Sequence, residues 1–309
     1  MTRLLTIAIA SAGRPSLVRT LNSLDEIDRP ADLDIRIVVA DDDPNGGARR
    51  LVEAMPPMRT PVTVTAVGSR NIARARNGCL EAASGDFLAF VDDDEWVARD
   101  WLMRMFAALR DFDADCVFGP VHPQYPAGTP DWLVAANPLY VEWGHRGKRV
   151  EIGRTGNTLV KRALIERHAL RFDPKFGQTG GSDTDFFHRL GKTGAIMVVT
   201  DDAMIYEDAP PERLKPTYLR MLALRKGQSY ARHRLAAIAS PGGRAGFVAG
   251  ALLKAAAGYA MTAALRPVDR ARSLKMLMKA RLNAGKLREV AGRPMPAVYR
   301  AVEDVQRPA

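Results

Sequence analysis

Short apolar runs alternate with segments of helical periodicity over the first two thirds of the chain. The runs are strand-length and rich in β-branched residues, and the segments between them place apolar residues three or four positions apart. We expect strands at residues 7–10, 35–40, 62–67, 87–91, 115–119 and 157–160. We expect helices at residues 15–24, 48–55, 71–84 and 101–109. This alternation predicts an α/β fold with a Rossmann-like, mostly parallel sheet flanked by helices.

Residues 120–158 interrupt the alternation. Five prolines fall in this segment, together with Trp132, Tyr140 and Trp143. We expect a long surface excursion that returns to the sheet near residue 157. Because long loops in compact domains are usually functional or disordered, the aromatic residues favour a binding loop.

The size and composition of the chain suit one large core with an appendage. It has 309 residues, of which 47% are hydrophobic and 26% charged. Cys79 and Cys116 are its only cysteines, and no segment of the secretory type precedes the first expected strand. We therefore expect the bulk of the protein to lie in a reducing cytoplasm, without structural disulfides.

The net charge of +10 is unevenly distributed. Residues 211–309 hold 20 Lys and Arg against 5 Asp and Glu, a balance of +15, whereas residues 1–210 hold 25 against 30, a balance of −5. We predict a catalytic domain at residues 1–210 and a basic, helical C-terminal extension at residues 211–309. Basic extensions of this kind bind anionic polymers or anionic membrane surfaces.

Three consecutive aspartates follow each of two expected strands, at residues 41–43 and 92–94. The carboxyl ends of parallel strands meet at one edge of a sheet, where α/β proteins bind ligands. Neighbouring carboxylates repel one another, and a divalent cation held by oxygen ligands would stabilise them. The alternative is a solvated acidic turn that caps the following helix.

A cationic helix start lies between the two acidic runs, at residues 70–77. Arg74 and Arg76 on this helix, with its N-terminal amides, are suited to bind phosphate. An ordinary solvated helix face is the alternative. The glycine-rich motifs of dinucleotide and P-loop sites do not occur in the sequence. The combination therefore predicts a site for a nucleoside diphosphate compound.

Six motifs follow one another along the chain: Ser11-Ala-Gly-Arg14-Pro15, Val39-Ala-Asp41-Asp42, Ala73-Arg74-Ala-Arg76-Asn77, Phe90-Val-Asp92-Asp93-Asp94-Glu95-Trp96, Gly156-Asn157-Thr158 and Gly180-Gly-Ser182-Asp183-Thr-Asp185-Phe-Phe187. In this order they resemble family 2 of the inverting glycosyltransferases, and in particular the succinoglycan-type glucosyltransferases of bacterial exopolysaccharide assembly. The resemblance covers residues 5–235 and implies a GT-A type fold.

The resemblance also implies roles for residues in these motifs. Asp41, with Asp42 nearby, would hold the nucleoside, and Ser11 and Arg14 would flank it. The remaining substrate-binding candidates are Arg74, Asn77, Asp92, Asp93, Asn157 and Asp185.

The metal site and the catalytic base follow from the same resemblance. Asp92 and Asp94 would hold Mg²⁺ or Mn²⁺, with Asp94 as the direct ligand. A metal ligand near the end of the catalytic domain would be Glu207 or Asp208. The cation offsets the charge that develops on the departing nucleoside diphosphate.

Asp183 is the expected catalytic base, within reach of the acceptor hydroxyl. The family has a Glu-Asp pair where this chain has Ser182-Asp183, so the role of the missing Glu is open. A structural interpretation is also available, since Ser182 as N-cap and Asp185 three residues later form a capping box.

The basic extension contains two segments with helical character. Residues 213–234 read as a basic amphipathic helix of the type that lies on membranes. Residues 245–265 are almost uncharged and long enough to cross a bilayer, but they are rich in Ala and contain Lys254. We expect interfacial or re-entrant helices in preference to a spanning one. A soluble helical subdomain is the alternative.

Together these features predict a metal-dependent inverting glycosyltransferase at the cytoplasmic face of a bacterial inner membrane. It would move a sugar from a nucleotide-sugar donor, expected to be UDP-linked, to a hydroxyl of a lipid-linked saccharide acceptor. One alternative is a nucleic-acid-binding protein that uses the basic extension, although the acidic domain would repel phosphate backbones. Another is a metal-dependent phosphoryl-transfer or hydrolytic enzyme.

Overall fold

The computed structural model describes residues 2–178 and 180–296 and divides the chain into two compact units. Unit 1 comprises residues 1–122 and 141–207, and unit 2 comprises residues 123–140 and 208–309. The division after residue 207 is close to the predicted end of the catalytic domain, but unit 2 also takes in residues 123–140. Residues 297–309 of the predicted extension lie outside the described part.

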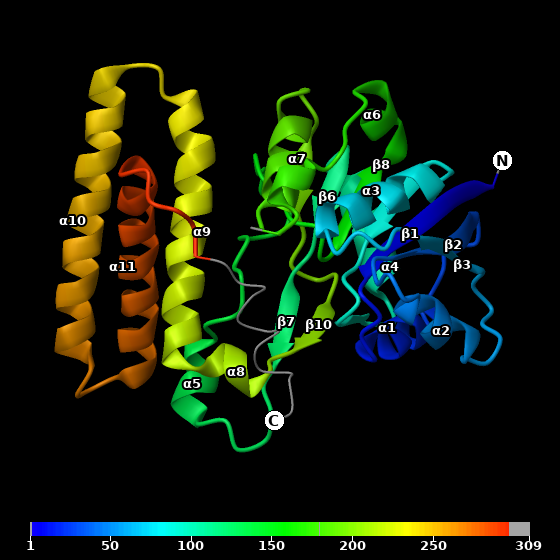
Figure 1. Cartoon of the computed structure of the whole chain (residues 1–309), viewed down its shortest axis with the longest axis horizontal. Helices are drawn as coiled ribbons and strands as arrows, with labels where there is room; N and C mark the ends of the chain where they lie inside the picture. Colours follow the sequence, from blue (N-terminus) through cyan, green and yellow to red (C-terminus); the bar gives the residue numbers. More distant parts are fainter. Residues whose placement is uncertain (1, 179, 297–309) are drawn as a thin grey trace. The chain divides into compact units, whose positions relative to one another are not determined.

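Unit 1 alternates strands and helices along the chain (Figure 1). Its strands are β1 (Arg3–Ser11), β2 (Leu33–Asp41), β3 (Val62–Ala66), β4 (Phe87–Phe90), β5 (Glu95–Val97), β6 (Cys116–Phe118), β8 (Thr158–Lys161) and β9 (Met197–Val199). Its helices are α1 (Ser16–Asp25), α2 (Gly47–Glu53), α3 (Ile72–Ala82), α4 (Trp101–Asp111), α6 (Arg162–Arg167) and α7 (Ser182–Gly191), with a 3₁₀ turn, η1, at Pro174–Phe176. Every strand and helix predicted in residues 7–119 is confirmed within a few residues at its ends.

The main sheet has seven strands in the order β3-β2-β1-β4-β8-β6-β9. Its pairs are parallel except those of β8, which runs antiparallel to both β4 and β6. The predicted mostly parallel sheet is thus confirmed, with one reversed strand inside it. A second sheet of three strands has the order β5-β10-β7, and the chain passes from unit 1 to unit 2 within β7 (Val121–Gln124) and β10 (Ile205–Asp208).

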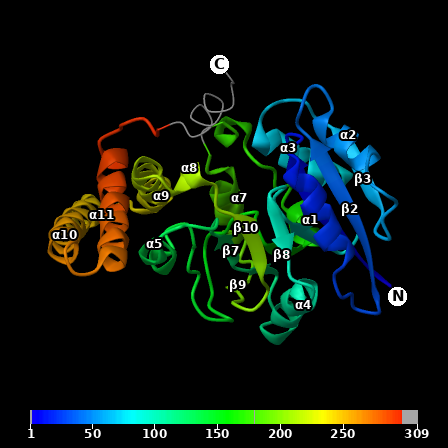
Figure 2. The same ribbon diagram turned by 90° about the horizontal axis from the view of Figure 1, so that it is seen from below.

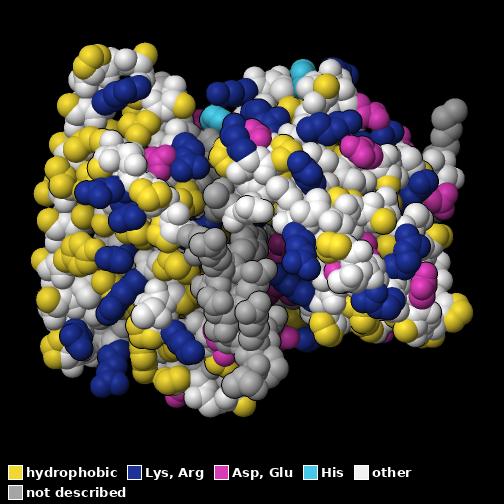
Figure 3. All heavy atoms as spheres, in the orientation of Figure 1, with side chains coloured by type: hydrophobic (Ala, Val, Ile, Leu, Met, Phe, Trp, Pro, Cys, Tyr) yellow, Lys and Arg dark blue, Asp and Glu magenta, His cyan; other side chains and the backbone are white. Residues whose placement is uncertain are grey.

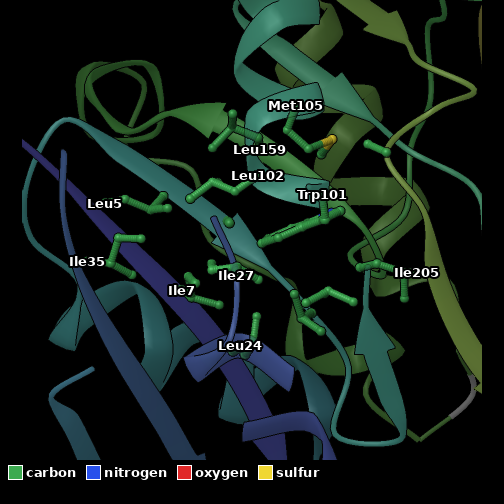
Figure 4. Packing of buried hydrophobic residues seen from close by; sticks show 14 of the residues in the cluster. Leu5, Ile7, Leu24, Ile27, Ile35, Trp101, Leu102, Met105, Leu159 and Ile205 are labelled. Atoms are coloured by element: carbon green, nitrogen blue, oxygen red, sulfur yellow. The ribbon is translucent and has the colours of Figure 1, made fainter. Parts of the chain in front are cut away.

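Both faces of the main sheet are buried, because alternate residues of its central strands enter two different cores. Leu5, Ile7 and Ile9 of β1 pack with α1 and α4 on one face, whereas Ala8 of the same strand packs with α3 and α7 on the other. Figure 4 shows part of the first core around Trp101, and Figure 2 shows the helices against the sheet. This packing fixes the strand ends on which the candidate site depends.

Unit 2 is built mainly of helices. They are α5 (Asp131–Ala136), α8 (Pro211–Leu214), α9 (Pro216–Ala237), α10 (Pro241–Leu265) and α11 (Arg270–Val290). Helix α11 packs between α9 and α10 and also contacts α5 (Figures 1 and 2). The backbones of α9 and α11 approach so closely that a Cβ at Gly227 would overlap the Leu282 carbonyl oxygen, and one at Gly285 would overlap that of Leu224. Glycine is what permits this contact.

Two predictions for these regions need correction. Residues 120–158 are not one long loop, because β7 and α5 form within them, and Trp143 stacks on Phe118 of the sheet at 5.8 Å. The predicted helix at residues 213–234 is broken at Pro216, which lacks the backbone N–H that a continuing helix needs. The buried side of α9 includes small residues such as Ala223 and Ala231. The prediction had relied on the larger apolar residues of this segment.

Candidate active site

The first acidic strand end is a buried, fully organised corner of the sheet. Ser11 of β1 pairs in register with Asp41 of β2, and the amide of Asp42 donates to the Ser11 carbonyl at 2.7 Å. The Asp41 carboxylate accepts hydrogen bonds from the Asp43 and Arg49 amides at 3.1 and 2.9 Å. These bonds hold Asp41 in one orientation at the carboxyl ends of β1 and β2.

Asp42 is held by a different segment. Its carboxylate accepts hydrogen bonds from the Ser69 amide at 2.8 Å and from the Ser69 hydroxyl at 2.7 Å. Ser69 lies between β3 and α3, so this contact ties the start of the cationic helix region to the end of β2.

Ser11 also connects the first acidic strand end to the second. Its hydroxyl donates to the Asp93 carboxylate at 2.7 Å, and the Arg14 guanidinium lies 3.2 Å from Asp93 and 3.0 Å from Asp94. Burial raises the pKa of Asp93 to about 6, against the lowering effect of Arg14. Asp94 and Asp92 raise that pKa further. The two predicted acidic runs therefore converge on one edge of the sheet.

Asp92 and Asp94 are the accessible members of the second run. Their side chains are 42% and 26% exposed, whereas that of Asp93 is only 7% exposed. Carboxylate oxygens with access to solvent can bind a hard cation. The structure thus separates two available carboxylates from a buried one that Ser11 and Arg14 hold in place.

Glu95 closes the turn that presents these aspartates. Its carboxylate accepts the Asp92 amide at 2.9 Å, and its own amide donates to the Asp92 carbonyl at 3.2 Å. Burial raises the pKa of Glu95, as does the Asp92 charge, while Arg154 opposes both. A Cβ at Gly156 would lie 2.5 Å from a Glu95 oxygen. Glu95 was not among the predicted site residues, although its position between an aspartate run and Trp96 was a signal for a role.

Arg76 of α3 links the second acidic strand end to the start of α7. Its side chain is 11% exposed, donates to the Ser182 hydroxyl at 3.0 Å and lies 3.5 Å from the Asp92 carboxylate. Asp183 follows Ser182 directly, so the predicted base belongs to a helix that this arginine connects to Asp92. Arg76 was predicted to bind phosphate, and in the structure it joins two parts of the protein.

The start of α7 differs from the predicted capping box. Gly181 is the N-cap, in the left-handed conformation with φ of 98°, and Ser182 is the first helical residue. Its hydroxyl accepts from Arg76 and does not cap the helix. Asp183 is partly exposed and accepts the Thr184 amide at 2.8 Å.

Asp185 makes an ion pair along α7. One oxygen of its carboxylate accepts two hydrogen bonds from Arg189, at 3.0 and 2.8 Å. This partner lies one turn further along the helix, and a contact of Asp185 with substrate stays a prediction.

Asn157 has a structural role inside unit 1, and its contact with substrate stays a prediction. Its side chain is fully buried, accepts from the Trp101 indole at 2.8 Å, and donates to the carbonyls of Pro120 and Ala203 at 2.7 and 2.8 Å. The amide group is therefore committed to joining α4 to two loops of unit 1.

Asn77 has the same kind of commitment. It exchanges two hydrogen bonds of 2.8 Å with the backbone of Phe172, one as donor and one as acceptor. Substrate binding by Asn77 stays a prediction. Arg74, one turn nearer the start of α3, is exposed.

Glu207 lies on β10 opposite Glu95 of β5. Its charge raises the pKa of Glu95 further, after the larger effects of burial and the Asp92 charge. Asp208 is exposed and belongs to unit 2. Within residues 2–178 and 180–296, no group of three or more His, Cys, Asp or Glu side chains is arranged to hold a metal ion by itself.

Comparison with known proteins identifies the family. The model of glycosyl transferase family 2 matches residues 7–171, which is more than half of the chain. The chain belongs to glycosyl transferase family 2. Its relatives include the succinoglycan biosynthesis protein ExoM of Rhizobium meliloti (strain 1021), which is 33% identical over 93% of this chain and 92% of its own length.

Solved structures agree on the fold. The mannosyltransferase PcManGT of Pyrobaculum calidifontis, in complex with GDP-Man and Mn²⁺, has a TM-score of 0.62 and 21% identity over 95% of this chain and 89% of its own. S. aureus TarS 1–349, in complex with UDP-GlcNAc, has a TM-score of 0.51 and 14% identity over 95% and 93%. The predicted GT-A type fold and glycosyltransferase class are confirmed. The nucleic-acid-binding and phosphoryl-transfer alternatives are set aside.

Proposed function

We propose that this family 2 enzyme is a metal-dependent inverting glycosyltransferase that moves a sugar from a UDP-sugar to a hydroxyl of a saccharide acceptor. One observation carries the proposal: a continuous set of contacts joins both acidic strand ends, through Ser11 and Arg14, and reaches the base-bearing helix through Arg76. A donor diphosphate and an acceptor hydroxyl require carboxylates, cationic groups and a base at one edge of the sheet.

The donor would bind at the carboxyl ends of β1, β2 and β4. Asp41 and Asp42 are the groups for the nucleoside, with Ser11 beside them. Arg14 and the exposed Arg74 supply positive charge for the diphosphate. TarS with UDP-GlcNAc and PcManGT with GDP-Man support a nucleoside-diphosphate sugar as the donor class.

The residues present fit a divalent cation. Asp94 and Asp92 would hold Mg²⁺ or Mn²⁺, with Glu207 as a further candidate, and such ions commonly complete their shells with water and substrate phosphates, so three protein ligands are not required. Bound there, the cation would neutralise charge on the diphosphate. The Mn²⁺ in the PcManGT complex supports this choice of cofactor.

Asp183 would act as the general base. As the acceptor oxygen forms its bond to the anomeric carbon, the bond from that carbon to the diphosphate oxygen breaks, and the acceptor proton passes to the Asp183 carboxylate. A single displacement of this kind inverts the anomeric configuration. The carboxylate is partly exposed at the first turn of α7, where an acceptor can approach it.

Arg76 would serve as a positioning residue for both partners. Its guanidinium contacts Asp92 on one side and Ser182 on the other. These two contacts would keep the metal-binding turn and the base at a fixed distance from each other. This contact also suggests why Ser182 suffices where other family members have Glu: a hydroxyl is enough to accept from the arginine.

Donor hydrolysis tests the site. In the presence of Mg²⁺ or Mn²⁺ the protein should release sugar and UDP from a UDP-sugar, and chelation should stop it. Asp94→Asn should abolish this activity, whereas Asp28→Asn, a change of an exposed aspartate paired with Arg99, should preserve it. Unchanged turnover in Asp94→Asn would refute the assignment, and release of inorganic phosphate would point to a different reaction.

The acceptor is proposed to be lipid-linked, in bacterial polysaccharide biosynthesis, with the enzyme at the cytoplasmic face of the inner membrane. Similarity to a succinoglycan biosynthesis protein supports this place, as does the basic character of residues 211–309. Among the described helices, α10 is long and apolar enough to cross a membrane, with a mean hydropathy of 1.4 in its most apolar window.

A further inference from the structure

Helix α10 packs on one side only. Its buried residues, Ala251, Ala255 and Gly258, recur at spacings of four and three and therefore share one face. That face meets α11 closely, since a Cβ at Gly258 would lie 2.9 Å from the Ala280 Cβ. The opposite side has no such partner within the described residues.

The outer face of α10 is exposed and carries no charge. Its most exposed large side chains are Leu253 and Leu252, 72% and 54% exposed, and Met261 and Tyr259 of the same helix are 48% and 40% exposed. Small apolar residues extend the face in both directions: Ala249, Ala256, Ala260 and Ala264. Figure 3 shows hydrophobic side chains along α10, with Lys and Arg side chains nearby. An extended apolar surface of this kind usually marks a binding surface.

Helix α11 is too strongly charged to enter the hydrocarbon core of a membrane together with α10. It carries seven Lys and Arg residues in 21 positions, of which Lys275 and Lys279 are exposed. Charged side chains of this kind are expensive at the bilayer centre. If α10 crossed a membrane, either these cations would enter with it or the tight contact at Gly258 would be lost.

The connection between the two helices resists separation. Residues 266–269 join them, and the Asp269 carboxylate caps α11 by accepting the Arg272 amide at 2.8 Å. The Ser273 hydroxyl of α11 donates to the Thr262 carbonyl of α10 at 2.9 Å. The pair therefore behaves as one rigid hairpin with an apolar side and a cationic side.

Lys254, the one charge in the middle of α10, does not disturb the apolar side. It lies near Lys286 of α11, since burial and then the Lys254 charge lower the pKa of Lys286. Its position is at the flank of the hairpin, where a long side chain can extend along the apolar surface and keep its ammonium among headgroups.

We propose that α10 lies in the plane of an anionic bilayer, with its outer face at the boundary of headgroups and acyl chains. The exposed cations of α11, Lys275 and Lys279, meet anionic headgroups beside it. At 25 residues the helix would cover about 37 Å of membrane surface at 1.5 Å per residue. This placement rests on the proposed membrane location of the enzyme but not on the assignment of catalytic residues.

Binding to vesicles of phosphatidylcholine and phosphatidylglycerol tests the apolar face. The full-length double variant Leu252→Gln, Leu253→Gln should bind roughly tenfold or more weakly than the parent in a sedimentation assay. Met103→Gln on α4, an apolar side chain 43% exposed in unit 1, is the matched control and should bind normally. Far-UV circular dichroism and donor hydrolysis without lipid should be unchanged in both proteins.

Two results would overturn the proposal. One is normal vesicle binding by the double variant. The other is a lower oligomeric mass of that variant in the absence of lipid, which would make the face an interface between copies of this chain. If the parent protein shows no donor hydrolysis, the catalytic proposal is refuted. The vesicle-binding result then stands on its own.

Labelling of single cysteines separates an in-plane helix from a spanning one. Gly242→Cys and Val268→Cys place thiols at the two ends of α10, both at exposed positions, while the native Cys79 and Cys116 are buried. Each variant is expressed in cells, and two preparations are labelled with an impermeant maleimide. Both new thiols should react in inverted inner-membrane vesicles, and neither should react in intact spheroplasts. A spanning helix would give one reactive thiol on each side and would refute the in-plane arrangement.

Discussion

The two units use opposite packing strategies. Unit 1 buries large apolar side chains on both faces of a sheet, and it gathers charged groups at strand ends, where they bind one another. Unit 2 brings helix backbones together through glycine and alanine, which leaves cations and larger apolar residues on its surface. A core of large side chains can hold a few carboxylates in fixed positions. Close helix packing through small residues instead leaves the larger side chains on the surface, where they can contact a binding partner.

Asp183→Asn tests whether the charges of unit 1 serve chemistry. We expect a loss of roughly 10²- to 10⁴-fold in kcat for transfer, because a general base typically contributes that much. Donor affinity, measured by titration with a UDP-sugar and Mn²⁺, should change little. Asp185→Asn on the same helix should retain activity within a few-fold, since its carboxylate is paired with Arg189. Equal losses in both variants would show that the effect is structural.

Gly227→Ala tests the packing of unit 2. The added methyl group would overlap the Leu282 carbonyl, so we expect a loss of about 1–3 kcal/mol in the free energy of unfolding. Gly246→Ala is the matched control in α10, where an added Cβ meets nothing within 4 Å. That change should stabilise the helix by roughly 0.5–1 kcal/mol. Denaturant titration of both variants measures the difference, and similar shifts would contradict the close approach.

Arg76→Lys tests the proposed connection between the turn that carries Asp92 and the helix that carries Asp183. A lysine keeps the charge but cannot reach two partners with a planar fork, so we expect kcat to fall about tenfold with little change in donor KM. Arg104→Lys, an exposed arginine paired with Asp100, is the control. Ser182→Ala should reproduce part of the loss, and the double variant should be no worse than Arg76→Lys. Additive effects would mean that the two residues act independently.

The smallest effect concerns the two thiols in the core of unit 1. Burial raises the pKa of Cys79 to about 12 and also raises that of Cys116. A raised pKa lowers the thiolate fraction at pH 8, so neither thiol should react with a disulfide reagent until the protein unfolds. Fast reaction of either thiol in the native protein would show that the core opens readily.

The periodicity of the sequence was sufficient for the fold of residues 7–119, because β1, β2 and β4 are buried on both faces and the helices each have an apolar stripe. It was insufficient for residues 120–158, where the prolines favoured a loop. One of them, Pro130, instead precedes a helix that begins at Asp131. It also missed the break at Pro216, since a basic apolar pattern continues on both sides of that proline.

Local motifs at strand ends were sufficient to predict which aspartates come together, but they did not show the contacts between residues far apart in the chain. Asp41, Asp93 and Asp94 converge as expected. Ser182 matches a capping pattern, yet its hydroxyl accepts from Arg76, which is 106 positions away in the chain. Asn157 looks like a motif residue, but partners from three other segments take up its side chain. Such contacts are tertiary, so no local pattern could show them.

The reversed strand β8 has a consequence for how the protein is made. Strands β1 to β4 pair with one another, so their part of the sheet can assemble as soon as the chain has been synthesised through Phe90. Strand β6 joins that part only through β8, and it must wait until the ribosome has added residues as far as Lys161. The strand ends that carry Asp41 can therefore form early during translation, whereas α7, which carries Asp183, is synthesised after β8 and before β9, the last strand of the sheet.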